Sequence, residues 1–375
     1  MKTIKGDVAL RVLILTGKFG MGHVAAAEAV ADQLRAYCGA QTEVVDLLES
    51  IHPKIYKGIY HGYNAMVNKI PRIYNSMICL DTQLSRLSLR EKPANAQVVG
   101  SLVRRYRPDV IVSTWLFGSK YIEAYRKRSG DRIPFVTCIT DIMAFDEWLS
   151  DETDAYIVGS EETKASLAAR GVDPAIVHVG GVPVRRAFGR CCRPAGGDAR
   201  EVLIMGGGLG FIPDADRILE TLAAMPRVHA TLITGWNQKL YSALKGKYAN
   251  IDVLGYTDDV PRYMEAADVI VTKSGGATTF ECIQAELPMF IVGPYFEQEK
   301  ANAAYIEEKS LGRVVWGRRP DCGDALAAFL ADADGRGRIK ENMRALKENM
   351  RGGQIGGIID SLLSQRNSEE IRLEG

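Results

Sequence analysis

The sequence predicts an α/β protein made of two Rossmann-like, doubly wound domains that face a central cleft. Two observations lead to this prediction. Apolar runs with continuous rather than alternating β-branched residues recur along the chain, as in parallel strands that are buried on both faces. These runs alternate with helical patterns, and the series stops and restarts around residues 189–200, a Gly- and Arg-rich stretch that is typical of a linker.

Each predicted strand ends in glycine or a polar turn, and a helical pattern follows it. The N-terminal domain, residues 1–190, opens with the run VLILT and an Ala-rich helix over about 25–37. The C-terminal domain covers residues 200–350, and we expect residues 351–375 to form a helix and tail that pack back on the N-terminal domain. The predicted strands are residues 12–16, 42–47, 110–115, 134–141, 155–160, 201–208, 229–235, 251–256, 267–276 and 288–294.

Composition narrows the possible functions. The 375 residues carry a net charge of +1, which gives no basis for binding nucleic acid in bulk. No stretch approaches the roughly 18 consecutive apolar residues of a membrane-spanning helix. The seven cysteines are scattered and match no metal-binding spacing, as in a protein of a reducing cytosol. We therefore expect a cytoplasmic protein without a metal site.

The stretch GKFGMGHVAAAEAV, residues 17–30, places glycines and His23 between the first strand and its helix. A glycine-rich turn at such a junction brings backbone N–H groups and a helix N-terminus to one point, which suits an anion or a reacting group. His23 could accept or donate a proton there. The alternative is a tight turn with a surface histidine.

The stretch MGGGLG, residues 205–210, follows a strand directly and would let a phosphate approach the backbone. A nicotinamide-cofactor motif needs G-x-G-x-x-G and an acid about 20 residues later. Phe211 stands at the last glycine position, and the next strand ends in ITGWNQ without an acid. The sequence therefore argues against an oxidoreductase.

The stretch KSGGATTFE, residues 273–281, lies where a strand gives way to a helix and predicts a diphosphate site at the helix N-terminus. Glu281, one turn further along, could accept both hydroxyls of a ribose. After the next strand, Gln298, Glu299 and Asn302 offer amide and carboxylate groups to sugar hydroxyls. Ordinary turns, a surface acid and a solvated loop are the alternatives.

Residues 52–92 have no strand pattern, are rich in Tyr, Ile, Leu and Met, and carry seven Lys and Arg against two acids. Such a basic, amphipathic stretch suits the surface of an anionic membrane. It suits equally a helical insertion that covers the core and leaves its lysines solvated.

Together these motifs resemble a known family. GYTDDVPRYM, KSGGATTFECIQAELP and QEKANAAYI look like the donor-binding half of GT-B glycosyltransferases of family twenty-eight, most of all the monogalactosyldiacylglycerol synthase and processive diacylglycerol glucosyltransferase branch. GMGHVAAAEA resembles the glycine–histidine motif of that branch, and IYKGIYHGYNAMVNKIPRIYNSMI its Tyr-rich acceptor segment. The resemblance covers about residues 9–360 and implies the GT-B fold.

The resemblance also implies roles for individual residues. His23 and Asp141 are the candidate catalytic bases, and Glu281 matches the acid that binds the ribose of the nucleotide. Gln298 and Glu299 match the pair that distinguishes the sugar. The other implied donor-binding residues are Gly207, Gly208, Tyr256, Val260, Ser274, Gly276, Ala277 and Thr278, and the implied acceptor-binding residues are Gly22, Tyr56, Tyr60 and Trp148.

The sequence departs from the branch in ITDIMAFDEWLSDETD, residues 139–154. Asp146 and Glu147 stand where the branch often has His and Pro, whereas Thr140, Asp141 and Trp148 remain. This departure leaves the preferred acceptor open and makes Asp141 a second candidate base.

The implied reaction is transfer of a hexose, with inversion, from UDP-glucose or UDP-galactose to a membrane lipid such as diacylglycerol. It implies no cofactor and no metal, because N–H groups would stabilise the departing diphosphate. It also implies a protein on the inner face of the cell membrane. Two alternatives stay open: another UDP-sugar enzyme of this fold (an N-acetylglucosamine transferase or a 2-epimerase), and a nucleotide-sugar sensor without activity.

Overall fold

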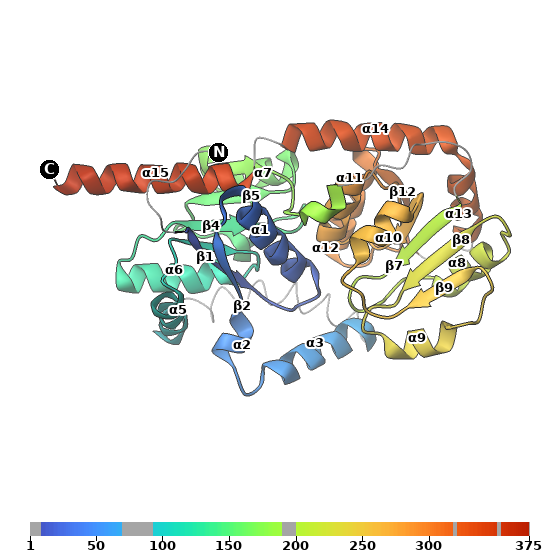
Figure 1. Cartoon of the computed structure of the whole chain (residues 1–375), viewed down its shortest axis with the longest axis horizontal. Helices are drawn as coiled ribbons and strands as arrows, with labels where there is room; N and C mark the ends of the chain where they lie inside the picture. Colours follow the sequence, from blue (N-terminus) through green and yellow to red (C-terminus); the bar gives the residue numbers. More distant parts are fainter. Residues whose placement is uncertain (1–8, 70–92, 190–199, 318–320, 351–353, 375) are drawn as a thin grey trace. The chain divides into compact units, whose positions relative to one another are not determined.

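A computed structural model of the chain describes residues 9–69, 93–189, 200–317, 321–350 and 354–374. The chain forms two compact units (Figure 1). Unit 1 contains Met1–Arg185 together with Met350–Gly375, and unit 2 contains Arg186–Asn349. The sequence of unit 2 is therefore inserted between two parts of unit 1.

Unit 1 is built on a parallel sheet that, within the described residues, has six strands in the order β2-β1-β3-β4-β5-β6. Its central strands are buried along their whole length, as expected from their continuous apolar runs. The strands are β1 (Arg11–Thr16), β2 (Gln41–Asp46), β3 (Val110–Ser113), β4 (Phe135–Cys138), β5 (Ala155–Val158) and β6 (Val177–Val179).

Helices cover both faces of this sheet. The helices are α1 (Gly22–Cys38), α2 (Leu47–Ile51), α3 (Tyr56–Lys69), α5 (Pro93–Tyr106), α6 (Gly118–Ser129), α7 (Glu161–Ala168) and α15 (Ile355–Glu374). One core lies beneath α1 and α15 and the other beneath α5 and α6. Ile355, Ile358 and Ile359 of α15 are buried against the alanine-rich face of α1. The start of α15 therefore belongs to the core of unit 1.

Unit 2 repeats the design with a parallel sheet that, in the described part of the chain, has the order β12-β11-β10-β7-β8-β9. Its strands are β7 (Glu201–Met205), β8 (His229–Ile233), β9 (Ile251–Leu254), β10 (Val269–Thr272), β11 (Met289–Val292) and β12 (Gly312–Val315). Its helices are α8 (Ala215–Ala223), α9 (Gln238–Leu244), α10 (Val260–Ala266), α11 (Gly276–Ala285), α12 (Glu297–Glu308), α13 (Cys322–Ala331) and α14 (Ala333–Asn349).

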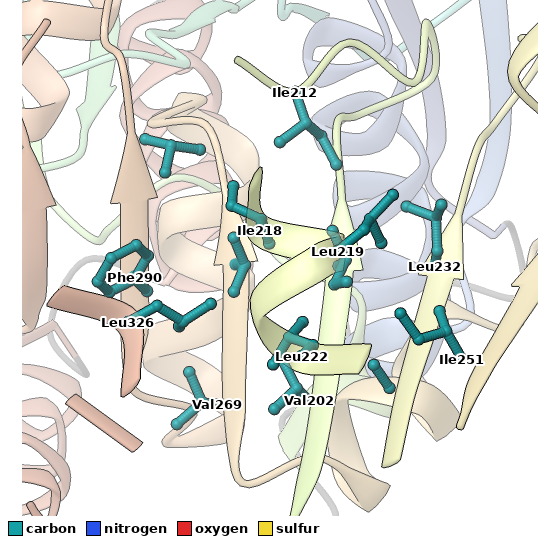
Figure 2. Close-up of a cluster of buried hydrophobic side chains, with 14 of the residues drawn as sticks. Val202, Ile212, Ile218, Leu219, Leu222, Leu232, Ile251, Val269, Phe290 and Leu326 are labelled. Atoms are coloured by element: carbon teal, nitrogen blue, oxygen red, sulfur yellow. The ribbon is translucent and has the colours of Figure 1, made fainter. Parts of the chain in front are cut away.

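One core of unit 2 is a cluster of aliphatic side chains between the sheet and two helices. Figure 2 shows Ile218 and Leu222 of α8 and Leu326 of α13 above Val202 of β7 and Val269 of β10. Full burial of one such side chain contributes about 1.5–3 kcal/mol. Because these side chains pack together, they hold the neighbouring strand ends at a fixed spacing.

The predicted α/β class with two doubly wound sheets is confirmed. Two edge strands, β6 and β12, were not predicted, because VHV and GRVV are too short and too polar to stand out as apolar runs. Within the predicted 52–92 insertion, the described residues include α3, and residues 70–92 lie outside the described part. Of the predicted linker at 189–200, residues 190–199 lie outside it as well.

Each sheet has one place where the chain changes the direction in which it adds strands. In unit 1 it lies between the neighbours β1 and β3, and in unit 2 between β7 and β10. The loops that leave two such strands run to opposite sides and open a crevice at the carboxyl edge of the sheet, where ligands of these folds bind. The glycine turns at 17–22 and 206–210 follow β1 and β7.

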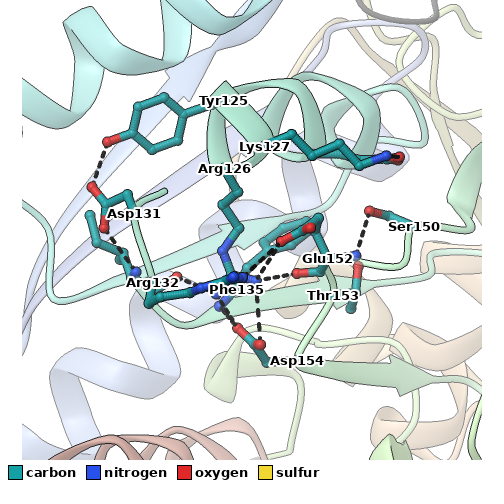
Figure 3. A network of polar contacts seen from close by, with 12 residues as sticks. Tyr125, Arg126, Lys127, Asp131, Arg132, Phe135, Ser150, Glu152, Thr153 and Asp154 are labelled. Atoms are coloured by element: carbon teal, nitrogen blue, oxygen red, sulfur yellow. Dashed lines mark hydrogen bonds and ion pairs between the residues drawn. The ribbon is translucent and has the colours of Figure 1, made fainter. Parts of the chain in front are cut away.

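At the amino ends of the strands in unit 1, a buried arginine joins three segments (Figure 3). The side chain of Arg126, on α6, is 5% exposed. Its Nη2 lies 2.7 Å from Oδ2 of Asp154 and donates to the carbonyl of Ile133 at 2.9 Å. Oδ2 of Asp154 also accepts the backbone N–H of Phe135 at 2.7 Å. The network links α6 to the starts of β4 and β5.

We expect Arg126→Met to lower the free energy of unfolding by about 3 kcal/mol, because it leaves Asp154 without its buried cation. Chemical denaturation followed by far-UV circular dichroism measures this change. Arg128→Met, on the exposed side of the same helix, is the matched control and should change stability by less than about 0.5 kcal/mol. Equal losses in the two variants would contradict this role for Arg126.

Candidate functional site

In unit 2, the glycine loop 206–210 packs too tightly to carry side chains at several positions. A Cβ on Gly210, which has φ +62°, would lie 2.0 Å from the carbonyl oxygen of Thr234. A Cβ on Gly235 would meet the carbonyl oxygen of Gly208 at 2.4 Å, and that oxygen accepts the N–H of Trp236. The ends of β7 and β8 thus hold the loop in one conformation, with Gly207 and Gly208 partly exposed.

The neighbouring strand end brings a lysine beside this loop. Lys273 follows β10, and its Cε lies 3.6 Å from the position of a Cβ built on Gly207. Its ammonium pairs with Oε1 of Glu299 at 3.2 Å. The hydroxyl of Thr272 donates to the carbonyl of Met205 at 2.6 Å and joins the two strand ends. A partly exposed cation therefore lies beside the glycine loop.

Helix α11 begins directly after this lysine. Gly275 is its N-cap and makes no side-chain cap, and the first turn contains no acidic residue. The first intrahelical bond runs from the N–H of Thr279 to the carbonyl of Gly275, so the N–H groups of Gly276, Ala277 and Thr278 precede the hydrogen-bonded ladder of the helix. These amides and the positive end of the helix favour an anion. Glu281 lies partly buried one turn further along.

Three predicted polar residues serve the structure. The hydroxyl of Ser274 is fully buried and donates to the carbonyl of Glu299 at 2.7 Å, and Asn302 donates its amide to the carbonyl of Ser274 at 2.9 Å. Oε2 of Glu299 accepts the N–H groups of Tyr295 and Phe296 at the start of α12. The Glu299 carboxylate thus binds both Lys273 and the start of α12, a role that the sequence did not indicate. Gln298 remains partly exposed.

The ends of β8 and β9 present an exposed aromatic pair. Tyr256 stacks on Trp236, with ring centroids 4.0 Å apart and planes inclined by 16°. The Tyr256 hydroxyl donates to Asp258 at 2.6 Å. Val260 is the first residue of α10 and lies partly buried beyond this turn. The edge that carries the predicted donor-binding residues Tyr256 and Val260 therefore has a second aromatic ring, that of Trp236, which was not among the predicted residues.

In unit 1, His23 lies at the crevice between β1 and β3. It is the second residue of α1, and Gly22 is the first. Its backbone carbonyl accepts the hydroxyl of Thr114 at 2.9 Å, and Nδ1 lies 3.0 Å from the hydroxyl of Thr140. Thr140, after β4, therefore contacts the ring of His23, and Thr114, after β3, contacts its backbone.

Burial of this imidazole favours its neutral form. Burial lowers the pKa of His23 below its usual 6.5, and the opposing effects of the Asp141 charge and of a hydrogen bond to the Thr114 backbone are smaller. The ring of Trp148 lies behind the imidazole, with centroids 6.1 Å apart. Trp148 is only 1% exposed, so its predicted contact with an acceptor is replaced by support of His23.

The predicted acceptor residues Tyr56 and Tyr60 lie on α3. Tyr56 is partly buried, and a hydrogen bond to Glu49 is the largest cause of its raised pKa. Tyr60 is 9% exposed, and its hydroxyl contacts Lys18 and Asp46 within the protein. The Tyr60 phenol is therefore engaged in the protein itself, and we reassign it from acceptor contact to support of the glycine turn.

No group of three or more His, Cys, Asp or Glu side chains that could hold a metal occurs among the described residues. In the same part of the chain, no helix is long and apolar enough to cross a membrane.

The structure places many of the predicted residues in one cluster in each unit. These are His23, Thr140, Asp141 and Trp148 in unit 1, and Gly207, Gly208, Ser274, Gly276, Ala277, Thr278, Glu281 and Glu299 around the β7–β10 crevice of unit 2. The sequence analysis missed Lys273, although a cation directly before SGG at a strand end was visible in it.

Comparisons with known proteins agree with this geometry. Two family models match in succession: monogalactosyldiacylglycerol (MGDG) synthase over residues 23–184, and glycosyltransferase family 28 C-terminal domain over residues 201–349. The processive diacylglycerol beta-glucosyltransferase of Bacillus subtilis is 26% identical over 367 residues, which cover 90% of this chain and 91% of the relative. Its Bacillus licheniformis counterpart is 26% identical over 358 residues, with coverage of 89% and 90%.

Solved structures share the fold. The glycosyltransferase of kitacinnamycin has a TM-score of 0.62 at 17% identity and covers 96% of this chain and 99% of its own. Acinetobacter baumannii MurG has a TM-score of 0.54 at 16% identity, with coverage of 95% and 98%. The architecture is that of GT-B glycosyltransferases. With the two family models matching in succession along its length, the chain belongs to glycosyltransferase family 28, in the branch of the monogalactosyldiacylglycerol synthases and processive diacylglycerol glucosyltransferases.

Proposed function

We propose that this protein is an inverting glycosyltransferase that moves a hexose from UDP-glucose or UDP-galactose to diacylglycerol. The observation that carries the proposal is the β7–β10 crevice of unit 2, where a glycine loop, a lysine and the uncapped start of α11 converge. Backbone amides, a cation and a helix N-terminus together suit a diphosphate. Family membership supplies the matching reaction class.

The donor-binding part of the proposal assigns one task to each group. The N–H groups of Gly276, Ala277 and Thr278 bind the diphosphate, and Glu281 accepts the ribose hydroxyls. The exposed pair Trp236 and Tyr256 borders the uracil. We propose that the protein needs no metal, because the amides and a lysine supply the positive charge.

The leaving group gains negative charge as the bond between the sugar and the diphosphate breaks. We assign Lys273 to this charge, because its ammonium lies beside the glycine loop and pairs with Oε1 of Glu299 at 3.2 Å. A preorganised cation in a partly desolvated site stabilises such charge more strongly than water does. Glu299 then serves mainly to position the ammonium group of Lys273.

The acceptor hydroxyl loses its proton as its oxygen attacks the anomeric carbon from the face opposite the diphosphate. We assign His23 as the base, because burial keeps its imidazole neutral near pH 7 and ready to accept a proton. Asp141 then stabilises the imidazolium that forms. The products are the glycosylated lipid and UDP.

We propose that the protein acts on the inner face of the cell membrane, as a peripheral protein. Near the start of α3, Lys54 and Lys57 are exposed beside Ile55, an exposed apolar side chain. Cations next to an apolar side chain suit an anionic bilayer surface. A lipid acceptor requires such contact, because diacylglycerol does not leave the bilayer.

The proposed function predicts hexose transfer at a membrane. Labelled UDP-glucose, UDP-galactose and UDP-N-acetylglucosamine are each incubated with phosphatidylglycerol vesicles that carry diacylglycerol. We expect a glycolipid from one or both of the first two donors, and about tenfold less product at high salt or with Lys54→Ala/Lys57→Ala. Epimerisation or hydrolysis of a donor without lipid, or binding without turnover, would support the other two interpretations instead.

The donor site predicts separate effects for two residues. We expect Glu281→Ala to weaken UDP binding at least tenfold in calorimetry, because the ribose loses its carboxylate partner. We expect Lys273→Met to lower kcat about 100-fold, because the departing charge loses its cation. Lys300→Met removes the exposed lysine–glutamate pair with Glu297 on α12 and serves as the control. Wild-type UDP binding by Glu281→Ala would remove the basis of the proposal.

The assignment of His23 predicts the pH dependence. Only the neutral imidazole accepts a proton, so kcat/KM should fall at acidic pH with an apparent pKa below 6.5. The Asp141 charge raises that pKa, so Asp141→Asn should move the acidic limb to lower pH. His229→Gln, in unit 2, is the control and should leave the limb unchanged. Complete loss of turnover in Asp141→Asn alone would make Asp141 the base.

A further inference from the structure

The glycine turn that carries His23 has few internal contacts to hold it. Residues 17–21 link β1 to α1, Gly20 has φ +73°, and the N-cap Met21 makes no side-chain cap. A turn of this composition gains little from its own side chains, and glycine loses the most conformational entropy on ordering. The conformation of this turn, which leads into α1 and His23, therefore depends on what packs against it.

Hydrogen bonds through the Tyr60 hydroxyl hold the backbone of the turn. The N–H of Lys18 donates to the hydroxyl of Tyr60 at 2.9 Å, and this hydroxyl donates to Oδ1 of Asp46 at 2.8 Å. Asp46 ends β2 and caps α2 through the N–H of Glu49, so it is itself fixed. The ammonium of Lys18 lies 3.5 Å from the other oxygen of Asp46. The Tyr60 phenol thus joins the turn to the sheet.

Aromatic contacts hold the side chain of Phe19, which belongs to this turn. The ring of Phe19 lies edge-on to Tyr60 and Tyr63 of α3, with centroids 4.9 and 5.1 Å away, and parallel to Trp115 at 5.5 Å. On the other side of the turn, a Cβ on Gly17 would lie 2.9 Å from the Trp115 ring. Aromatic pairs of this geometry contribute about 0.5–1.5 kcal/mol each beyond their burial.

We propose that Tyr60 is a positioning residue, which acts on the transferred proton through the 17–21 turn and His23 and does not touch the acceptor. The inference rests on the proposed function, and it adds a second role to α3, the helix whose start we assign to the membrane. Burial of the Tyr60 phenol raises its pKa, so the hydroxyl keeps its proton and can donate to Asp46 while it accepts from Lys18.

The decisive test is a double-mutant cycle. Tyr60→Phe keeps the ring against Phe19 and removes the hydroxyl. We expect it to lower kcat about tenfold with the donor KM unchanged, because misplacement of a catalytic group slows the chemical step rather than donor binding. In a His23→Ala background, the same change should lower the residual kcat less than twofold. An equal loss in both backgrounds would overturn the inference, since Tyr60 would then act independently of His23.

Tyr125→Phe is the matched control for general destabilisation. Tyr125 is 8% exposed, and its hydroxyl donates to Asp131 at 2.6 Å, so the same kind of buried phenol–carboxylate bond is lost on α6 (Figure 3). We expect a decrease in Tm similar to that of Tyr60→Phe and an unchanged kcat. An equal decrease in kcat would mean that Tyr60 contributes only to stability.

A measurement without substrates separates this inference from the proposed function. The imidazole of His23 can be titrated by NMR in the free protein, where we expect a pKa below 6.5. If Tyr60 holds the turn, Tyr60→Phe admits water and raises this pKa toward 6.5, and Tyr125→Phe leaves it unchanged. Absence of hexose transfer would refute the proposed function alone, whereas an unchanged His23 titration in Tyr60→Phe would refute the positioning role.

Discussion

Both candidate sites depend on one constraint, the point in each sheet where the chain reverses its direction of strand addition. At this point two parallel neighbours send their loops to opposite sides and leave the crevice open. A threonine hydroxyl joins the strand ends in both units: Thr114 contacts Thr16 in unit 1, and Thr272 donates to the Met205 carbonyl in unit 2. These bonds hold the edges on which His23 and Lys273 lie.

The two crevices use the same geometry for different chemistry. In unit 1, burial lowers the pKa of His23 and favours the neutral imidazole, against the smaller opposing effect of the Asp141 charge. In unit 2, Lys273 and the uncapped start of α11 give positive potential. A transferase needs both properties, because a proton must be taken from the acceptor while negative charge develops on the leaving group. In the proposed mechanism these tasks fall to residues of two different sheets, so each environment can be tuned without disturbing the other.

The sequence was sufficient for what depends on local pattern. Ten strands were predicted near their observed positions, because most of them are buried, continuously apolar runs, and glycine turns at their ends located both crevices. The roles of Tyr60 and Glu299 could not be predicted. Tyr60 contacts Lys18 across 42 positions, and Glu299 contacts Lys273 across 26, so no periodicity relates them. The burial of Trp148 likewise follows from tertiary packing around a short turn.

The return of the chain to unit 1 through α15 has a consequence for biosynthesis. Ile355, Ile358 and Ile359 cover the apolar face of α1, yet all of unit 2 lies between these two helices in the sequence. While the ribosome translates unit 2, the nascent first unit must remain partly uncovered, with Val30 and Leu34 exposed to water and to other chains. Its core closes only after residues 355–359 emerge, so the interval in which chaperones would protect this protein is set by the length of the inserted unit.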